Sequence, residues 1–401
     1  MNHTKNELLE YVRDNDIKFV KLTFCDLLGR HRNITILSSE LESAFEKGVA
    51  IASTAVTGID GVDLKLIPET AMLSDTPWRS HSGRVISVFC RLADIDCKPY
   101  ECDPIALLER QVNKLAELGI TAHVATECEF YVFKPEDEDG KIEPFDRGDY
   151  CACSPFDKCE NIRKDVIMSL EDVGLKPISA HHERGPGQNE VDFERSDPIT
   201  AARNFVMFKS AVKNVCFING TVASFMPKPI SDQPGSGLHI AITLSGADAK
   251  QTGAFAEGIL KRYKEITCLA NPTLNSYKRL GDKYKICYGA NRGKAVRIFG
   301  DNIIQLRTPD STCNIFSVLA LVFAAGREGI EKNYKLRKAE VFDEYLFACL
   351  NEAVEFARGS EWLHKQIPAE LDNVLDTIAT RCTDAQNLKT DRDFFDFYAD
   401  I

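Results

Sequence analysis

His-His-Glu-Arg-Gly-Pro-Gly-Gln-Asn-Glu-Val-Asp-Phe, residues 181–193, places two carboxylates, Glu183 and Glu190, at either end of a turn. The Gly-Pro-Gly in the middle of this stretch favours a tight change of chain direction. Both flanks are typical of strands, Lys-Pro-Ile-Ser-Ala at 176–180 and Val-Asp-Phe at 191–193. The stretch therefore predicts two strands joined by a short loop that carries acidic groups.

A second acidic pair lies upstream, in His-Val-Ala-Thr-Glu-Cys-Glu-Phe-Tyr-Val-Phe, residues 123–133. Its β-branched and aromatic residues predict a strand. Glu127 and Glu129 then share one face, roughly 7 Å apart. Two carboxylates on an apolar strand are costly to bury without a partner. A divalent cation held by oxygen ligands is one answer, with Glu183 and Glu190 completing its cage; solvated glutamates or glutamate–arginine pairs are the alternative.

The composition indicates a globular protein with a large core. The chain has 401 residues, 44% hydrophobic and 27% charged, and a formal net charge of −11. This charge argues against nucleic acid or an anionic membrane as the main partner, although ATP can still bind locally. No apolar run approaches the roughly 20 residues of a membrane span. The first ten residues lack the apolar core of a signal peptide, so we expect a cytoplasmic protein.

The fourteen cysteines mostly stand singly within apolar patterns, which is typical of reduced thiols that fill a core. Cys151, Cys153 and Cys159 form a group that could bind zinc or respond to redox state. The group lacks the Cys-x-x-Cys pairing typical of zinc sites. Its role stays open.

The first hundred residues predict a small α+β unit. A turn around Gly29 is expected to join its first two strands. Ser38 or Ser39 is expected to begin its second helix, and Gly48 to end it. The expected elements are helices at 4–14 and 39–47 and strands at 19–26, 30–36, 64–69 and 84–92.

A larger unit, residues 101–401, follows. Asp103 and Pro104 are the cap and first turn of an expected helix that stops at Gly119. Strands with polar side chains then alternate with helices. The segment 314–332 is apolar nearly all round and predicts a buried helix. Residues 337–401 predict charged helices without a chemical motif.

Several further motifs occur in a fixed order. They are Phe225-Met-Pro-Lys-Pro, Gly235-Ser-Gly-Leu-His239, Asn271-Pro-Thr-Leu-Asn-Ser-Tyr-Lys-Arg-Leu280, Asn291-Arg292, Ala295-Val-Arg-Ile298 and Arg307-Thr-Pro-Asp310. Together with the Glu-x-Glu strand and the His-His-Glu loop, they closely resemble glutamine synthetase. The resemblance covers about residues 16–335.

This resemblance implies an α+β protein with a small N-terminal β-grasp domain, residues 1–100, and a catalytic domain with a curved antiparallel sheet, residues 101–401. It implies Mg²⁺ or Mn²⁺ as cofactor and ATP as co-substrate. In that family ATP phosphorylates a glutamate side chain, and ammonia displaces the phosphate. It also implies homo-oligomeric rings, hexamers or dodecamers, with active sites between subunits.

The resemblance assigns roles position by position. Glu129, Glu183 and Glu190 match the ligands of a first metal, and Glu127, His239 and Gln305 stand at the ligand positions of a second. The catalytic arginines of the family match Arg279, Arg292 and Arg307. Its substrate-binding positions match Gly235, His239, Arg279 and Arg307, and its ATP-binding positions match Arg292 and Arg297. Without the resemblance, His239 could be a strand histidine whose hydrogen bonds are made within the fold, and the arginines could be charged residues of the surface.

Several positions depart from the family pattern. Gln305 replaces a glutamate, and an amide oxygen is a weaker, neutral ligand. Lys285 stands in Gly-Asp-Lys-Tyr-Lys, 281–285, where a glutamate that helps to deprotonate ammonium is expected. Ala52 lies in 51–58, a loop without the ammonium-binding aspartate. Ala241 replaces a histidine, and Ile303 an arginine, in a segment, 298–306, that is short for the family.

These departures leave three hypotheses. The first is an ATP-dependent ligase that activates glutamate, or a similar amino acid, and joins it to an amine other than ammonia; residues 52–57 and 283–285 would shape the amine pocket. The second is a ring-forming binding, regulatory or structural protein without ligase activity. The third is metal-dependent chemistry on a glutamyl compound without ATP.

Overall fold

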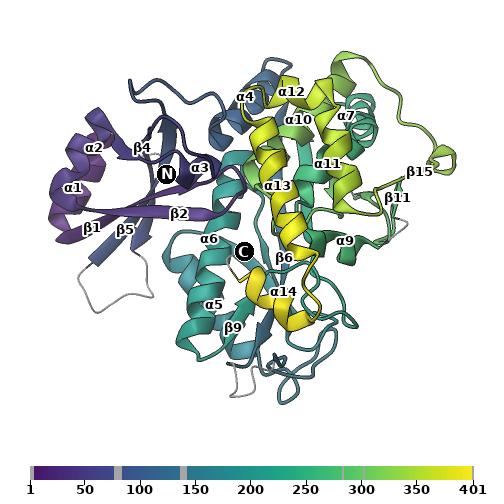
Figure 1. Cartoon of the computed structure of the whole chain (residues 1–401), viewed down its shortest axis with the longest axis horizontal. Helices are drawn as coiled ribbons and strands as arrows, with labels where there is room; N and C mark the ends of the chain where they lie inside the picture. Colours follow the sequence, from purple (N-terminus) through teal and green to yellow (C-terminus); the bar gives the residue numbers. More distant parts are fainter. Residues whose placement is uncertain (1–3, 76–83, 136–141, 282–283, 301–302, 400–401) are drawn as a thin grey trace.

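Two sheets of different size organise the protein, whose computed structural model describes residues 4–75, 84–135, 142–281, 284–300 and 303–399. Figure 1 shows a smaller N-terminal unit beside a larger unit in which helices cover a second sheet. The predicted α+β architecture with a β-grasp N-terminal domain and a curved, mainly antiparallel catalytic sheet is confirmed.

The N-terminal unit is a five-stranded sheet in the order β2-β1-β5-β4-β3. β1 pairs in parallel with β5, and the other neighbours are antiparallel. Helices α1 and α2 lie on its outer flank (Figure 1). The elements are α1 Lys5–Asp14, β1 Ile17–Cys25, β2 His31–Leu37, η1 Ser38–Glu40, α2 Leu41–Lys47, β3 Val49–Ile51, α3 Thr54–Thr57, β4 Leu64–Asp75 and β5 Arg84–Ala93.

The expected elements of this unit are present, with one wrong detail. Gly48, at φ 67°, ends α2 as expected. Ser38 and Ser39 do not cap this helix: they lie inside η1, and neither η1 nor α2 has a side-chain cap. The chain turns into α2 through this short 3-10 segment, so no serine hydroxyl stands at the N-cap position.

The turn between β1 and β2 connects the two units. Gly29, at φ 83°, packs so closely that a Cβ there would lie 2.5 Å from the Cα of Asn314. Asn314 Nδ2 donates to the carbonyl oxygens of Asp26 (3.1 Å) and Leu27 (3.3 Å). The oxygen of the same amide caps the first turn of α10. One residue therefore begins the central helix and holds the N-terminal hairpin against it.

The second sheet has eight strands, of which seven follow the order β12-β13-β14-β10-β6-β8-β7 while β9 pairs with β6. All described pairs are antiparallel except β12 with β13. The strands are β6 Thr121–Phe133, β7 Pro177–His182, β8 Gln188–Phe193, β9 Val222–Ser224, β10 Leu238–Ser245, β12 Tyr288–Gly289, β13 Val296–Phe299 and β14 Ile303–Leu306; β11 Lys285–Ile286 pairs separately with β15 Glu344–Tyr345.

Helices cover this sheet and form the main core. Asp103 caps α4, whose first residue is Pro104, as expected. α10 is the predicted buried helix, with apolar contacts on nearly every side. The helices are α4 Pro104–Ala116, α5 Glu160–Asp172, α6 Pro198–Ile218, α7 Ala249–Lys261, α8 Tyr263–Ala270, α9 Leu274–Leu280 and α10 Ile315–Glu331.

The C-terminal region is mostly helical, as expected, and packs along the larger unit (Figure 1). Besides β15 it contains η2 Ala339–Val341, α11 Leu350–Arg358, α12 Glu361–Gln366, α13 Leu371–Ala385 and α14 Asp391–Phe397. Among the described residues, none of the helices combines the length and apolar character needed to cross a bilayer.

Candidate active site

A cavity of about 620 Å³ lies over one face of the large sheet. Five carboxylates from β6, β7–β8 and their turn line one part, and arginines lie around the rest. The lining residues are Glu127, Glu129, Tyr150, His181, Glu183, Arg184, Gln188, Glu190, Asp192, Pro234, Gly235, His239, Arg292, Gly293, Arg297, Phe299 and Arg307. Most of the residues singled out in the sequence meet here.

The alternation of β6 places its two glutamates on the cavity face. Thr126, Cys128 and Phe130 are buried on the other face, while Glu127 and Glu129 are only partly covered. The register extends this pattern across the sheet. Glu129 pairs with Glu190 on β8, and Glu127 pairs with His239 on β10. These four side chains therefore stand in two adjacent rows.

The loop between β7 and β8 is held from beneath by a buried ion pair. His182 Nε2 lies 2.9 Å from Asp146 Oδ1, and both side chains are fully buried. His182 Nδ1 donates to the carbonyl oxygen of Glu183 (2.6 Å), and Asp146 also accepts from the backbone N–H of Gly187 (2.8 Å). Asp146 and His182 thereby hold both ends of the turn by hydrogen bonds to its backbone, which fixes the position of Glu183.

Two groups of ligand atoms share Glu190. Atoms of Glu129, Glu190 and His239 all lie within 4.8 Å of one another, and so do atoms of His181, Glu183 and Glu190. Bonds of 2.0–2.6 Å to one cation span such distances. His239 Nδ1 is buried without a hydrogen bond, only 3.3 Å from Glu127 Oε2 in poor geometry. These residues therefore fit a cation. The resemblance assigned His239 to the second metal, but the structure groups it with Glu129 and Glu190, the expected ligands of the first metal.

The electrostatics of this cluster indicate an uncompensated negative charge. Burial raises the pKa of Glu190 well above its usual range, and the nearby Glu129 and Asp192 add to this shift. Burial also raises the pKa of Glu129, against the opposing effect of His239 and the Gly237 N–H. A divalent cation would stabilise both carboxylates in their ionised form.

The position expected for the second metal is occupied by direct hydrogen bonds. Gln305 Nε2 lies 3.0 Å from both carboxylate oxygens of Glu127, and Gln305 Oε1 accepts from Arg307 Nη1 at 3.0 Å. Rotating the amide by 180° would face oxygen against carboxylate and nitrogen against guanidinium, so the hydrogen-bonding partners determine its orientation. The amide thus presents a donor, and the set Glu127, His239 and Gln305 does not fit a second cation in this arrangement.

Three arginines form the other part of the cavity. Arg307 Nε donates to the carbonyl oxygen of Arg292 (2.8 Å), so the two residues are held together. Arg292 hydrogen-bonds Tyr150, which raises the pKa of its guanidinium. Arg297 lies over the Phe299 ring at 3.9 Å, and its Nε donates to the carbonyl oxygen of Ala290 (3.0 Å). This arrangement can receive anionic groups such as phosphates and carboxylates.

Arg279 lies beneath the cavity wall and does not line it. Its Nη2 donates to the carbonyl oxygens of Thr308 and Pro309. A Cβ on Gly235 would lie 2.5 Å from Arg279 Cγ and 2.7 Å from the carbonyl oxygen of Pro227. Only glycine lets this wall segment close over the arginine. In this structure Arg279 supports Gly235.

The departures from the family pattern lie mostly outside the cavity. Lys285 is in β11 with its ammonium 5.9 Å from the centre of the Tyr345 ring. Ala52 belongs to the N-terminal unit, and neither Ala52 nor Lys285 lines the cavity. Ala241 pairs with Gln305 and is buried, and Ile303 starts β14. Residues 282–283 and 301–302, named in the sequence analysis, lie outside the described part.

The cysteine group carries no sign of a metal centre. Cys151 and Cys153 are exposed and Cys159 is buried. Among the described residues, the clusters with metal-binding geometry contain no cysteine.

Sequence reasoning missed some of the lining residues. Tyr150 reaches the cavity from the loop before α5, where its ring contacts His181 edge-on at 5.5 Å. Gln188 donates to Glu129 Oε2 (3.3 Å) and to the carbonyl oxygen of Gly235 (3.2 Å). Gln188 stands two residues before Glu190 on β8, which begins three residues earlier than the predicted strand at 191–193. A strand extended back to residue 188 would have placed both side chains on one face. No local pattern marked Tyr150.

Comparisons with known proteins point to one family. The catalytic-domain model of glutamine synthetase matches residues 101–401, and its β-grasp-domain model matches residues 16–95. The glutamine synthetase of Clostridium saccharobutylicum is 34% identical over 358 residues, 82% of this chain and 81% of the relative. That of Mycolicibacterium smegmatis is 32% identical over 409 residues, 94% and 90% of the two chains. A ligand-free GmaS structure superposes with a TM-score of 0.87 at 24% identity, covering 96% of this chain and 97% of that one, and shows the shared fold.

Proposed function

The chain belongs to the glutamine synthetase family, and from this premise we propose that it is an ATP-dependent ligase joining an amino-acid carboxylate to an amine other than ammonia. The acid is glutamate or a similar amino acid, activated as an acyl phosphate. Mg²⁺ or Mn²⁺ supplies Lewis-acid stabilisation of the phosphates when it is bound.

One observation carries the ligase proposal. Glu129, Glu183 and Glu190 lie on the same cavity as Arg292, Arg297 and Arg307. Phosphoryl transfer between two anionic reactants needs a cation site beside anion-binding groups, because the negative charge of both reactants must be offset. The carboxylates would hold the cation, and the arginines would hold phosphate and carboxylate oxygens.

The choice of amine rests on what the acidic residues of the cavity do. Its five carboxylates, Glu127, Glu129, Glu183, Glu190 and Asp192, all come from β6 and the β7–β8 hairpin with its turn. They belong to the cation cluster or its border. The segment 284–290 contains no Asp or Glu, and its Lys285 stands where the resemblance expects the glutamate that helps to deprotonate ammonium. Without a carboxylate there to bind and deprotonate ammonium, a neutral or larger amine is favoured.

The Gln305–Glu127 hydrogen bonds support a single tight cation position. In a two-cation site, Glu127 and a carboxylate at position 305 would both be ligands. Here position 305 carries no charge, and the Gln305 amide stabilises the Glu127 carboxylate by hydrogen bonds without a metal. We propose that Glu129, Glu183, Glu190 and His239 bind one cation tightly, and that any second cation binds weakly.

The domain boundary near residue 100 and the ring assembly are part of the same proposal. Residues 52–57, which would shape the amine pocket, do not line the cavity of their own chain. A neighbouring subunit could supply this segment, as the family's ring architecture implies. Multi-angle light scattering would distinguish a hexamer or dodecamer from a monomer.

A coupled ADP-release assay tests the function. It would contain Mg²⁺, glutamate and, one at a time, ammonium, short alkylamines, hydroxyalkylamines, diamines and polyamines. We expect amine-dependent ADP release that is faster with an organic amine than with ammonium. Glu129→Ala should abolish it, whereas Glu117→Ala, at an exposed position, should not. Faster turnover with ammonium than with any organic amine would contradict the proposed specificity.

The hydrogen-bonded Gln305 also favours a second candidate function, a ring-forming binding protein that no longer ligates. Absence of ADP release across the whole panel, from protein that binds an ATP analogue and Mg²⁺, would support this candidate. A metal-dependent reaction without nucleotide would instead appear as turnover of a glutamyl compound that chelation abolishes.

A further inference from the structure

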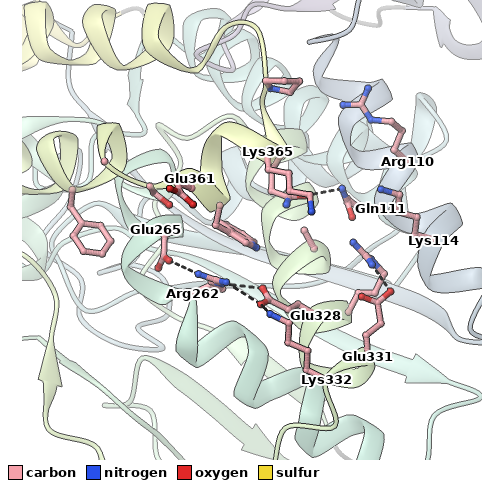
Figure 2. A pocket seen from close by; sticks show the side chains of 18 of the residues that line it. Arg110, Gln111, Lys114, Arg262, Glu265, Glu328, Glu331, Lys332, Glu361 and Lys365 are labelled. Carbon is pink, nitrogen blue, oxygen red and sulfur yellow. Dashed lines mark hydrogen bonds and ion pairs between the residues drawn. The ribbon is translucent and has the colours of Figure 1, made fainter.

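A second cavity, of about 1060 Å³, lies between α4, the end of α10, the end of α11 and α12. It shares no lining residue with the candidate active site. Figure 2 shows Arg110, Gln111 and Lys114 entering from α4, while Lys365 comes from α12. Residues 110, 111 and 114 share one face of α4 because positions three and four apart on a helix are neighbours.

Six cations and six carboxylates line this cavity, so its total charge is balanced. Half of each set is paired with another residue of the lining, and Glu355 is paired with Arg358 outside it (3.8 Å). Arg262 contacts Glu328 (3.0 Å) and Glu265 (3.0 Å), Lys332 contacts Glu328 (2.5 Å), and Arg327 contacts Glu331 (2.5 Å). The three remaining acids are Glu101, Glu355 and Glu361, and the three remaining cations are Arg110, Lys114 and Lys365.

These three cations have no carboxylate partner within ion-pair distance among the described residues. Arg110 donates only to the carbonyl oxygen of Glu101 (3.2 Å). Lys114 and Lys365 are exposed at the rim. In Figure 2, Glu361 and Glu265 lie toward the other side of the cavity from Arg110 and Lys114. Glu101 also lies at this end, but the three unpaired cations of α4 and the C-terminal half of α12 outnumber it. This end of the cavity is therefore positive, although the whole lining is neutral.

A buried amide at this end also lacks a partner. Gln111 is 6% exposed, and its Oε1 is buried without a hydrogen bond in the described structure. Its Nε2 donates to Gln366 Oε1 across the two helices at 3.3 Å, and in this arrangement Oε1 is the atom of the amide that is left without a partner. Buried acceptors without a donor are rare, because no hydrogen bond then offsets the free-energy cost of removing the acceptor from water. Gln111 Oε1 is thus available to a donor from a bound molecule.

We propose that this cavity binds a small polyanion that carries a hydroxyl or amino group. Arg110, Lys114 and Lys365 bind its carboxylates or phosphate, and Gln111 Oε1 accepts a hydrogen bond from its hydroxyl or amino group. The cavity volume suits a metabolite-sized ligand. The inference does not depend on the proposed ligase activity, because no residue is shared with that site.

Isothermal titration of the whole protein, freed of divalent cations on a chelating resin, tests the proposal with three probes. Citrate is a polycarboxylate with a hydroxyl group, tricarballylate is the same molecule without it, and 3-phosphoglycerate is the phosphorylated alternative. We expect saturable binding of citrate or 3-phosphoglycerate. The one that binds more tightly shows whether the natural ligand is a polycarboxylate or a phosphorylated compound. Citrate should bind about fivefold tighter than tricarballylate, since one hydrogen bond has roughly this value.

Two variants locate the binding. Lys114→Gln/Lys365→Gln should weaken it by about tenfold or more, because two attractive charges are lost. Lys250→Gln/Lys335→Gln, which removes two exposed lysines outside the cavity, should leave it unchanged. Gln111→Leu should remove the difference between citrate and tricarballylate. All variants are compared by circular dichroism, so that loss of folding is recognised.

Two results would overturn the proposal. One is the absence of saturable heat with citrate and with 3-phosphoglycerate up to about 10 mM, which would mean negligible affinity. The other is binding that the lysine pair in the cavity and the lysine pair outside it affect equally, since the charge at α4 and α12 would then not be responsible.

Discussion

Gln305 Nε2 lies 3.0 Å from each carboxylate oxygen of Glu127, across the strands β14, β10 and β6. In the family, a glutamate at position 305 would repel Glu127 unless a cation lay between them. The amide converts this repulsion into attraction. The side chain at this one position therefore determines how many cations the site needs.

Gln305→Glu should restore a second cation position. Two facing carboxylates form an oxygen-rich set that Mn²⁺ can use. We expect Mn²⁺ binding, measured by titration calorimetry and electron paramagnetic resonance, to change from one tight site per chain to two. Gln305→Met, which is of similar size but uncharged, should keep one site. Two tight sites in the unmodified protein would refute this interpretation.

Cation binding should release protons. The pKa values of Glu190 and Glu129 are raised in the metal-free protein, so part of each carboxyl is protonated above the ordinary range near 4.3. A cation requires the ionised forms, and its affinity should therefore rise with pH. Calorimetry of Mn²⁺ binding at pH 7 in buffers of different ionisation enthalpy should show release of about one proton.

Glu190→Gln is the matching variant for this release. It should lower the number of protons released and weaken Mn²⁺ binding by about a hundredfold or more, as expected for loss of a ligand shared by both groups of atoms. If the release were unchanged in this variant, Glu190 would not be the group that loses the proton.

Asp146→Asn should destabilise the β7–β8 turn. It leaves His182 buried without its charged partner, a change that typically costs about 3 kcal/mol. Urea unfolding should measure this loss, and the exposed Asp149→Asn should cost little. Loss of stability without loss of Mn²⁺ affinity would show that the pair holds the fold but does not position Glu183.

The same variant predicts a pH dependence. The hydrogen bond and charge of His182 lower the pKa of Asp146 in spite of burial, so the aspartate's contribution is present above its ordinary pKa and lost as the pH falls through the lowered value. Although burial acts in the opposite direction, Asp146 raises the pKa of His182, so its contribution is present below its ordinary pKa and lost as the pH rises through the raised value. The difference between the unmodified protein and Asp146→Asn should be largest near pH 5–6.

Gly235→Ala should displace Arg279. The new Cβ would lie 2.5 Å from Arg279 Cγ, and the cost of such overpacking is about 1–3 kcal/mol. We expect a lower melting temperature and a raised KM for the amino acid. Gly253→Ala on α7 is the control, because its Cβ would meet Leu336 at 3.6 Å, an ordinary contact, and alanine favours the helix. Equal effects of the two substitutions would contradict the role of Gly235.

The features that sequence predicted well are local ones. Strand alternation correctly placed Glu127 and Glu129 on one face, because the period of two depends only on neighbouring residues. Asp103 and Pro104 begin α4 as expected, because helix capping also depends only on neighbouring residues. The grouping of His239 with Glu129 and Glu190 could not be read from spacing, because it depends on the register between β6 and β10.

Other features depend on partners far away in the chain. The orientation of the Gln305 amide follows from Arg307 on one side and Glu127 on the other, and only the folded sheet brings them together. Tyr150 enters the cavity from a loop without a periodic pattern. The absent serine cap at Ser38 or Ser39 reflects a 3-10 turn that competes with the α-helix at this boundary.

The parallel pairing of β1 with β5 has a consequence for biosynthesis. β1 is an inner strand of its sheet, yet residues 26–83 must be made before β5 begins. At about 5–20 residues per second, the open edge of β1 waits a few seconds for its partner on the ribosome. Nascent chains of this protein are therefore expected to be most prone to aggregation, and most dependent on chaperones, between completion of the β1–β2 hairpin and emergence of residue 93.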